Sequence, residues 1–381
     1  MDTLAAVFRE IRQPLSIERI TLDPPGPTEV LVRLAAVGLC RTDYHVIRGE
    51  RRVAMRPMVL GHEAAGIVEQ IGTAVEGIKP HDHVVLTFIP ACGICCWCRA
   101  GLHHLCAEGP RITHGPQLDG TYRRRDHAGI AVGAFCMIGA FAERTVVDQA
   151  SVIVIDKDIP LDLASLVACG VPAGVGAARY RARVKHGDSV LVVGCGGDGM
   201  NVVQGARLCG ASKIIAADIV TAKLDWAREF GASHGINAQG EALTRAVLEL
   251  TDGIGVNHAF VCIDPPATLV PAFRATTKGG NVVVTGLTPD SVAEIRIPPL
   301  ELFVTQKAIM GAVYGFASPR LQIPELLKLY RSGNLKLREL ITQTYQLDQI
   351  NAGYSDLDAG KNLRGVVVFA HQWQPEMAWY S

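Results

Sequence analysis

The sequence predicts an α/β protein in which a doubly wound parallel sheet is inserted in a second domain that is rich in β-strands. The segment from Ser189 to Asp218 carries the first part of this prediction, because it contains an apolar run, a turn with four glycines, a helix-length segment and a second apolar run. That order is strand, turn, helix, strand. The first forty residues instead alternate short β-like runs with turn signals, as an all-β unit does. A chain of 381 residues has room for both domains.

Composition excludes several classes of partner. The chain has 37 basic and 37 acidic residues, so its formal charge is zero and we predict neither a nucleic-acid nor a membrane partner. The first ten residues carry charges where a signal peptide needs an apolar core, and we predict a cytoplasmic protein. In that compartment the eleven cysteines are expected to be metal ligands or buried thiols, not disulfides.

The N-terminal part supplies two candidate metal ligands. Strand-like runs at 5–8, 15–20 and 30–37 lead into the motifs G-L-C-R-T-D-Y-H and G-H-E, which contain Cys40 and His62. A thiolate and an imidazole are ligand types that zinc prefers. A lone cysteine or histidine is more often buried filler, so this pair needs further ligands to define a site.

The segment from 92 to 106 reads C-G-I-C-C-W-C-R-A-G-L-H-H-L-C. Four cysteines separated by two, two and seven residues predict a closed, structural zinc site: Cys92, Cys95, Cys98 and Cys106. Cys96 falls outside that spacing and is interpreted as a spare thiol, although exchange with a neighbouring cysteine stays open. A redox CxxC pair is disfavoured because it needs only two thiols.

Three features precede the glycine turn. The basic run at 123–125 is interpreted as a solvated face, or else as the entrance to a site for an anionic group. The stretch 133–147 shows strand-like alternation. Cys169 stands just before the dinucleotide-binding unit and is the natural third ligand beside Cys40 and His62. Two thiolates and one imidazole leave one zinc position open, as in a catalytic site.

The glycine turn and the acid after it predict NAD binding. Gly194 allows a tight turn, Gly196 lets the backbone approach a pyrophosphate, and Gly199 lets the helix pack closely on its strand. Asp218 is placed to accept hydrogen bonds from the adenosine ribose and to repel a 2′-phosphate, which favours NAD over NADP. Asp198 departs from the usual apolar residue of such turns, and we hypothesise that it tunes how the cofactor is held.

The remaining pattern completes the sheet and returns to the first domain. Helices are expected at 223–230, 241–251 and 323–332, and strands at 258–263 and 281–285. Residues 360–369 are expected to bring the chain back to the first domain. We predict a catalytic domain formed by 1–170 with 314–381 and an NAD-binding domain at 171–313. The tail after Ala370 has no readable role.

Together these motifs resemble the zinc-dependent medium-chain alcohol dehydrogenases over residues 5–369. The resemblance implies a Rossmann sheet inserted in a GroES-like catalytic domain. The stretch G-A-F-C to F-A-E-R-T-V-V, the loop retained before it and the ending N-L-R-G-V look most like the nicotinoprotein, nitrosoaniline-dependent branch. Enzymes of that branch keep NAD bound through turnover and reoxidise it with a second acceptor.

The resemblance also implies roles for single residues. Around the catalytic zinc it places the ligands Cys40, His62 and Cys169, the transient ligand Glu63, Asp43 as the carboxylate that orients His62, Thr42 as the partner of the substrate hydroxyl and His45 as the proton acceptor. For the cofactor it implies pyrophosphate contacts by Arg41 and Arg364, ribose contacts by Asp218 and Lys223, and phosphate contacts by the turn glycines Gly194, Gly196, Gly197 and Gly199. Phe88 and Phe135 fall where the family lines its substrate pocket.

The expected activity is the reversible oxidation of an alcohol to an aldehyde or ketone by hydride transfer to NAD, with one catalytic and one structural zinc per chain. A homodimer and an unknown electron acceptor are expected partners. The first alternative is a thiol-dependent formaldehyde dehydrogenase, which needs a basic pocket for a large anionic conjugate, built from Arg51 and Arg52 or from the run at 123–125. The second is a non-catalytic NAD-binding protein, which the intact set of zinc and relay residues disfavours.

Overall fold

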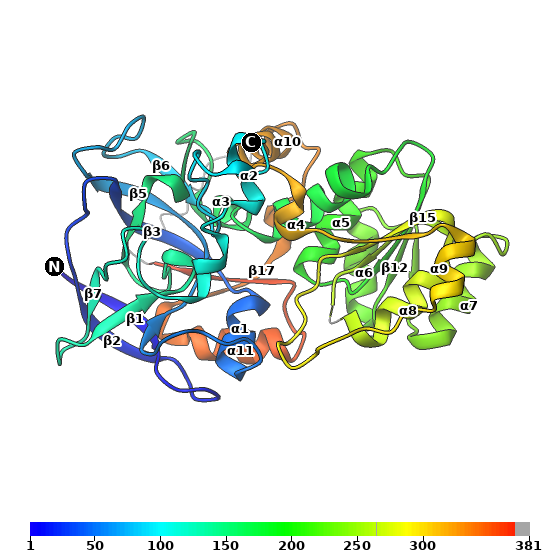
Figure 1. Ribbon diagram of the computed structural model, residues 1–381, viewed down its shortest axis with the longest axis horizontal. Coiled ribbons are helices and arrows are strands. Elements are labelled where there is room, and N and C mark those ends of the chain that lie inside the picture. The colour runs from blue at the N-terminus through cyan, green and yellow to red at the C-terminus, as the bar shows by residue number, and fades with distance from the viewer. Residues whose placement is uncertain (264, 370–381) are drawn as a thin grey trace, which may run out of the picture.

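The computed structural model describes residues 1–263 and 265–369, which form two lobes (Figure 1). The N-terminal lobe contains a closed barrel with the order β1-β2-β7-β8-β4 and a sheet with the order β10-β6-β5-β3-β18-β17, to which β9 is added through β3. Its strands are β1 (Asp2–Phe8), β2 (Ser16–Leu22), β3 (Glu29–Gly38), β4 (Met58–Val59), β5 (Glu63–Ile71), β6 (His83–Leu86), β7 (Arg124–Arg125), β8 (Ala131–Ala134), β9 (Arg144–Asp148), β10 (Val152–Ile155), β17 (Ile341–Tyr345) and β18 (Arg364–Val368).

The other lobe is built on a parallel sheet with the order β13-β12-β11-β14-β15-β16. Its strands are β11 (Ser189–Val193), β12 (Lys213–Ala217), β13 (His234–Ile236), β14 (Val256–Val261), β15 (Thr276–Val284) and β16 (Ala308–Gly311). The strand order reverses direction between β11 and β14, and ligands of such sheets bind at that point, beyond the carboxyl ends of the strands. The predicted α/β class with a β-rich partner domain is therefore confirmed.

Helices cover the parallel sheet and link the lobes. They are α1 (Arg41–Arg48), α2 (Cys96–Arg99), α3 (Leu161–Leu166), α4 (Gly170–Gly176), α5 (Gly197–Leu208), α6 (Thr221–Phe230), α7 (Gly240–Leu250), α8 (Pro265–Ala275), α9 (Pro299–Thr305), α10 (Pro319–Arg331) and α11 (Ile350–Asp358). In Figure 1, α4 and α5 lie between the lobes, and α1 and α11 lie together on the side that faces the parallel sheet. Strand β18 pairs antiparallel with β3, with Val366 opposite Gly38, so the end of the described chain lies in the sheet of the first lobe.

Two interpretations of the sequence are corrected by the structure. The stretch 133–147 is not continuous strand, because Cys136 and Met137 have φ values of 57° and 58° and turn the chain between β8 and β9. The basic run is a solvated face only in part: Arg125 is exposed, whereas Arg124 is buried and donates to the carbonyl of Ile138 at 2.6 Å. Its neighbour Arg123 pairs with Glu29 at 2.6 Å.

No helix within 1–263 and 265–369 is both long and apolar enough to cross a membrane. Residues from Ala370 onward, including the tail, lie outside the described part of the chain.

Candidate active site

Four side chains with metal-binding atoms meet where the lobes face each other. Candidate ligand atoms of Cys40, His62, Glu63 and Cys169 all lie within 4.8 Å of one another. Cys40 directly precedes α1, His62 directly precedes β5, and Cys169 directly precedes α4. All three predicted ligands therefore stand at the ends of rigid elements, in one largely buried cluster.

Sheet pairing and close helix packing bring these residues together. Strands β3 and β5 are antiparallel with Gly38 opposite Glu63, which sets Cys40 and His62 side by side just beyond the two strand ends. Cys169 is positioned by α4 packing against α5, where a side chain at Gly174 would clash with the carbonyl oxygen of Asp198. Only a glycine allows this approach, because any Cβ would force the two helices apart.

The donor set suits zinc. Nδ1 of His62 lies 3.0 Å from Oδ2 of Asp43, so Nε2 is the nitrogen left for a metal, as is usual for a ligating histidine. Interaction with Cys169 lowers the pKa of the Cys40 thiol well below its usual range, even though burial raises it. A thiolate is the form that binds zinc. One oxygen of Glu63, Oε1, is buried without a hydrogen-bond partner in the described chain, so it remains free to act as a ligand.

Arg364 connects the cluster to the glycine turn. Its guanidinium contacts the other oxygen of Glu63, and its Nη1 lies 2.6 Å from where a Cβ at Gly197 would stand. The pyrophosphate contact expected for Arg364 is compatible with this position, because the same side chain reaches both the buried acid and the start of α5.

Two aromatic rings contact His62, and a third packs on one of them. The ring of Phe88 is 5.6 Å and that of Phe135 6.0 Å from the imidazole, both edge-on. Tyr314, which we did not single out from the sequence, packs on Phe88 at 4.2 Å and donates to the carbonyl of Ala168 at 2.5 Å. The aromatic V-Y-G-F string was the available signal, but its distance in sequence from Cys169 concealed the contact.

The glycine turn has the shape that a bound pyrophosphate requires. Gly194 has a φ of 91°, a Cβ at Gly199 would collide with the carbonyl of Gly194, and a Cβ at Gly196 would meet nothing within 4 Å. Open space beside Gly196 and the N-terminus of α5 is the usual cradle for phosphates. At the end of β12, Asp218 accepts the backbone N–H groups of Cys195 at 2.8 Å and Val220 at 2.9 Å, which fixes its carboxylate.

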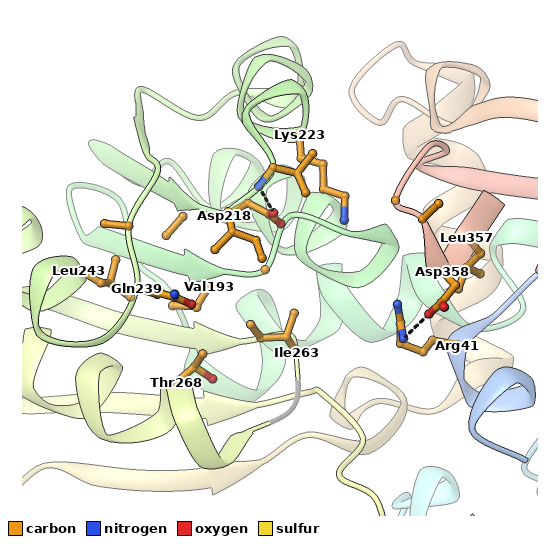
Figure 2. Close-up of a pocket in the computed structure, with 17 residues that line it drawn as sticks. Arg41, Val193, Asp218, Lys223, Gln239, Leu243, Ile263, Thr268, Leu357 and Asp358 are labelled. Carbon is orange, nitrogen blue, oxygen red and sulfur yellow. Dashed lines mark hydrogen bonds and ion pairs between the residues drawn. The ribbon is translucent and has the colours of Figure 1, made fainter. Parts of the chain in front are cut away.

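A cavity of about 300 Å³ opens beside Asp218. Figure 2 shows Asp218 and Lys223 on one side, and Arg41 and Asp358 on the other, where Nη1 of Arg41 lies 3.8 Å from Oδ1 of Asp358. Residues of the parallel-sheet lobe and of α1 and α11 thus line the same cavity. Arg41, expected at the pyrophosphate, is engaged by an acid that the sequence reasoning missed.

Asp198 lies in the first turn of α5, with Oδ1 3.2 Å from where a Cβ at Gly170 would stand. Among the described residues it makes no hydrogen bond or ion pair. Burial, followed by the negative charge of Cys40, raises its pKa to about 7. The unpaired carboxyl therefore sits between the glycine turn and the helix that starts after Cys169.

The two residues predicted to carry the proton, Thr42 and His45, lie in α1, shortly after the predicted zinc ligand Cys40. Thr42 is half-buried, and His45, three residues later on the same side of the helix, is buried. Nδ1 of His45 lies 2.7 Å from Oε2 of Glu50, an acid that we did not single out from the sequence. Its position five residues after His45, beyond the end of α1, gave no local signal.

The four-cysteine segment folds as one cluster apart from this site. Candidate ligand atoms of the predicted set, Cys92, Cys95, Cys98 and Cys106, lie within 4.8 Å of one another. The neighbouring Cys96 is exposed and outside the cluster. All eleven cysteines lie in the described chain and none forms a disulfide.

Comparison with known proteins decides the family. Residues 26–157 match the family described as alcohol dehydrogenase GroES-like domain, and residues 197–332 match the zinc-binding dehydrogenase family. The NDMA-dependent alcohol dehydrogenase of Amycolatopsis methanolica is 41% identical over 370 residues, covering 97% of this chain and 99% of the relative. This chain belongs to the zinc-dependent medium-chain alcohol dehydrogenases. It is accordingly an NAD- and zinc-dependent oxidoreductase, as the motifs predicted.

Solved structures of other medium-chain alcohol dehydrogenases have the same architecture. A zinc-binding alcohol dehydrogenase domain protein from Burkholderia ambifaria superposes with a TM-score of 0.92 at 34% identity, covering 97% of this chain and 100% of that one. Benzyl alcohol dehydrogenase from Acinetobacter calcoaceticus gives 0.91 at 32% identity with the same coverage. The Rossmann and GroES-like parts of the prediction are thus confirmed.

Proposed function

We propose that this alcohol dehydrogenase is a nicotinoprotein, in which NAD stays bound through turnover and is reoxidised in place by a second acceptor. The observation that carries the proposal is the cavity beside Asp218, which is lined by residues of α1 and α11 of one lobe and of the Rossmann lobe on the other side. A dinucleotide held there would contact both lobes at once. The 41% identity to an NDMA-dependent enzyme supports the same branch.

Each predicted site residue has a proposed role in this reaction. Zinc would be held by Cys40, His62 and Cys169 and would supply Lewis acidity to the alcohol oxygen, while NAD would supply the hydride acceptor. Thr42 orients the substrate hydroxyl and passes on its proton, and His45 receives that proton.

The remaining contacts hold the reactants. Arg364 and Arg41 bind the pyrophosphate with the turn glycines, and Asp218 with Lys223 binds the adenosine ribose. Phe88 and Phe135, together with Tyr314, make the substrate pocket apolar and aromatic next to His62. Such a pocket favours an alcohol with an apolar substituent and excludes water from the reacting atoms.

The branch is tested with protein purified without added cofactor. We mix it with a primary alcohol and compare dye reduction without NAD to NADH formation with added NAD and no dye. Rapid dye reduction, with nicotinamide dinucleotide released when the protein is denatured, is the expected result. Activity only with added NAD would identify an ordinary dehydrogenase whose cofactor dissociates in each turnover.

A thiol-dependent formaldehyde dehydrogenase is the second candidate. The S-(hydroxymethyl)glutathione dehydrogenase of Saccharomyces cerevisiae is 38% identical over 372 residues, covering 96% of this chain and 95% of the relative. Several arginines proposed for an anionic conjugate are already engaged, however: Arg123 by Glu29, Arg124 by a backbone carbonyl and Arg51 by Asp290. Formaldehyde oxidation that depends on added thiol would favour this candidate over the first.

We further propose a homodimer formed along the edge of the parallel sheet. Within the described chain β16 pairs with β15 alone, and the adjacent α9 exposes Leu300, Phe303 and Val304. An open edge beside an apolar surface is suited to a second copy of the chain. Sedimentation of wild type and Phe303→Glu tests this, with a dimer expected for the first and a monomer for the second.

The domain boundaries 1–170 with 314–381 and 171–313 are proposed as given by the sequence. The cytoplasmic location and the existence of a second, unknown electron acceptor likewise remain predictions.

A further inference from the structure

The buried histidine of α1 has one polar contact that leads toward solvent. His45 is 3% exposed, and its Nδ1 lies 2.7 Å from Oε2 of Glu50. The side chain of Glu50 is 33% exposed. A buried imidazole is therefore joined by one short hydrogen bond to a carboxylate that water reaches.

We propose that Glu50 is the outlet of the proton path, taking a proton from His45 and releasing it to water. This inference rests on the proposed role of His45 as proton acceptor. Because Glu50 occupies Nδ1, only Nε2 of His45 is left to accept the proton that the alcohol loses. As Nε2 gains that proton, the Nδ1–H bond breaks and its proton passes to Oε2 of Glu50. Water then removes the proton from Glu50 and restores the carboxylate, which leaves His45 protonated at Nε2 instead of Nδ1. Before the next turnover His45 returns to the Nδ1–H form by exchanging protons with water, so no net charge accumulates.

The surroundings keep Glu50 ionised, which is the form that can take up a proton. Its other oxygen, Oε1, lies 3.3 Å from Nε of Arg48. Burial raises the pKa of Glu50, but the hydrogen bond from His45 and the nearby charge of Arg48 lower it overall. The charged groups beside this segment also include Arg51 and Asp290, which pair with each other at 3.7 Å. Each oxygen of the Glu50 carboxylate therefore has one partner: His45, which can be protonated, and Arg48, which is cationic.

The Rossmann lobe holds Glu50 in place. Asp290, in the segment after β15, donates its backbone N–H to the carbonyl of Glu50 at 2.8 Å and accepts the N–H of Arg52 at 2.9 Å through Oδ2. Two backbone contacts from the opposite lobe fix the chain on both sides of Arg51. Glu50 is therefore a positioning and proton-accepting residue whose geometry depends on contact between the lobes.

The test is a single turnover in weak buffer, comparing Glu50→Gln with Glu294→Gln, which removes an exposed acid of the same Rossmann segment. Cofactor reduction is followed by absorbance and proton release by a pH indicator. We expect Glu50→Gln to keep its zinc and cofactor while proton release slows about tenfold, and added imidazole to restore the rate by accepting the proton directly. Glu294→Gln should match wild type, and Glu50→Asp should recover part of the rate.

Proton release in Glu50→Gln that equals wild type would overturn the inference. So would a slow release that imidazole does not restore, because a merely structural defect is insensitive to an external base. The absorbance of the wild-type protein tests the proposed function separately. If the cofactor is not reduced when alcohol is added, the protein does not oxidise the alcohol, and both the proposed function and the proton path are contradicted.

Discussion

The carboxylate of Asp43 lies 3.0 Å from the imidazole of His62, with its Oδ2 facing Nδ1. Its other oxygen, Oδ1, accepts the backbone N–H of Gly61 at 2.9 Å. Asp43 is wholly buried, so neither contact is weakened by water. This arrangement sets Nδ1 of the histidine against a carboxylate and leaves Nε2 for the metal.

Replacing Asp43 with Ala should weaken the catalytic zinc site by roughly 10- to 100-fold, because His62 loses the partner that orients it. After dialysis against a mild chelator, we expect the metal content to fall from two zinc ions per chain toward one. The four-cysteine cluster serves as the internal control. Retention of both ions with full activity would contradict the role given to Asp43.

Replacing Cys98 with Ser should remove the structural zinc, since Cys98 is buried within the four-thiolate cluster. We expect the thermal midpoint to fall by about 5 °C or more, which corresponds to roughly 2 kcal/mol in a domain of this size. Cys96→Ser is the matched control, because Cys96 is exposed and adjacent to the cluster. Zinc retained by Cys98→Ser would mean that Cys96 takes the place of Cys98, and equal zinc loss in both variants would contradict the assignment of Cys96 as a spare thiol.

At a pH about one unit above the pKa of about 7, where the carboxyl of Asp198 is mostly ionised, replacing Asp198 with Ile should weaken NAD⁺ binding about fivefold relative to NADH, because the oxidised ring is positively charged and the carboxylate attracts it. The measurement is the dissociation constant of each form, determined calorimetrically on cofactor-free protein. Asp198→Asn, which removes the charge while keeping the shape, should behave similarly. Unchanged affinity and turnover in Asp198→Ile would disprove the hypothesis that Asp198 tunes how the cofactor is held.

His258 should make stability depend on pH. Burial lowers its pKa, although the hydrogen bond to Asp188 at 2.9 Å opposes the shift. As pH falls below about 6.5, the unfolded chain therefore takes up a proton that the folded chain resists, and stability is lost. Between pH 7.5 and 5.5, wild type should lose more thermal stability than His258→Gln. Zinc loss in acid affects both proteins alike, so an equal loss would contradict this prediction.

Patterns with short spacing were predicted well. The predicted order of strand, glycine turn, helix and strand around 189–218 was confirmed, with β11, α5 and β12 as the regular elements. Such elements are decided by the local spacing of apolar residues and by the conformational freedom of glycine. The four cysteines between 92 and 106 also meet in one cluster. The strand-like alternation predicted for 133–147 holds only at its two ends, in β8 and β9, because the positive φ values of Cys136 and Met137 turn the chain between them and no local signal marked that turn.

The sequence by itself determined the family, both cofactors and the residue types that could hold them, because these depend on motifs whose spacing is fixed along the chain. Only the tertiary structure decided which distant side chains meet. Arg364 contacts Glu63, which is 301 positions away in the sequence, and Asp358 lies beside Arg41. Glu50 is hydrogen-bonded to His45 through its side chain and to Asp290 of the other lobe through its backbone carbonyl. Such contacts arise from the pairing of distant strands and from the approach of the two lobes. Neither of these produces a repeating pattern in the amino-acid sequence that could be recognised beforehand.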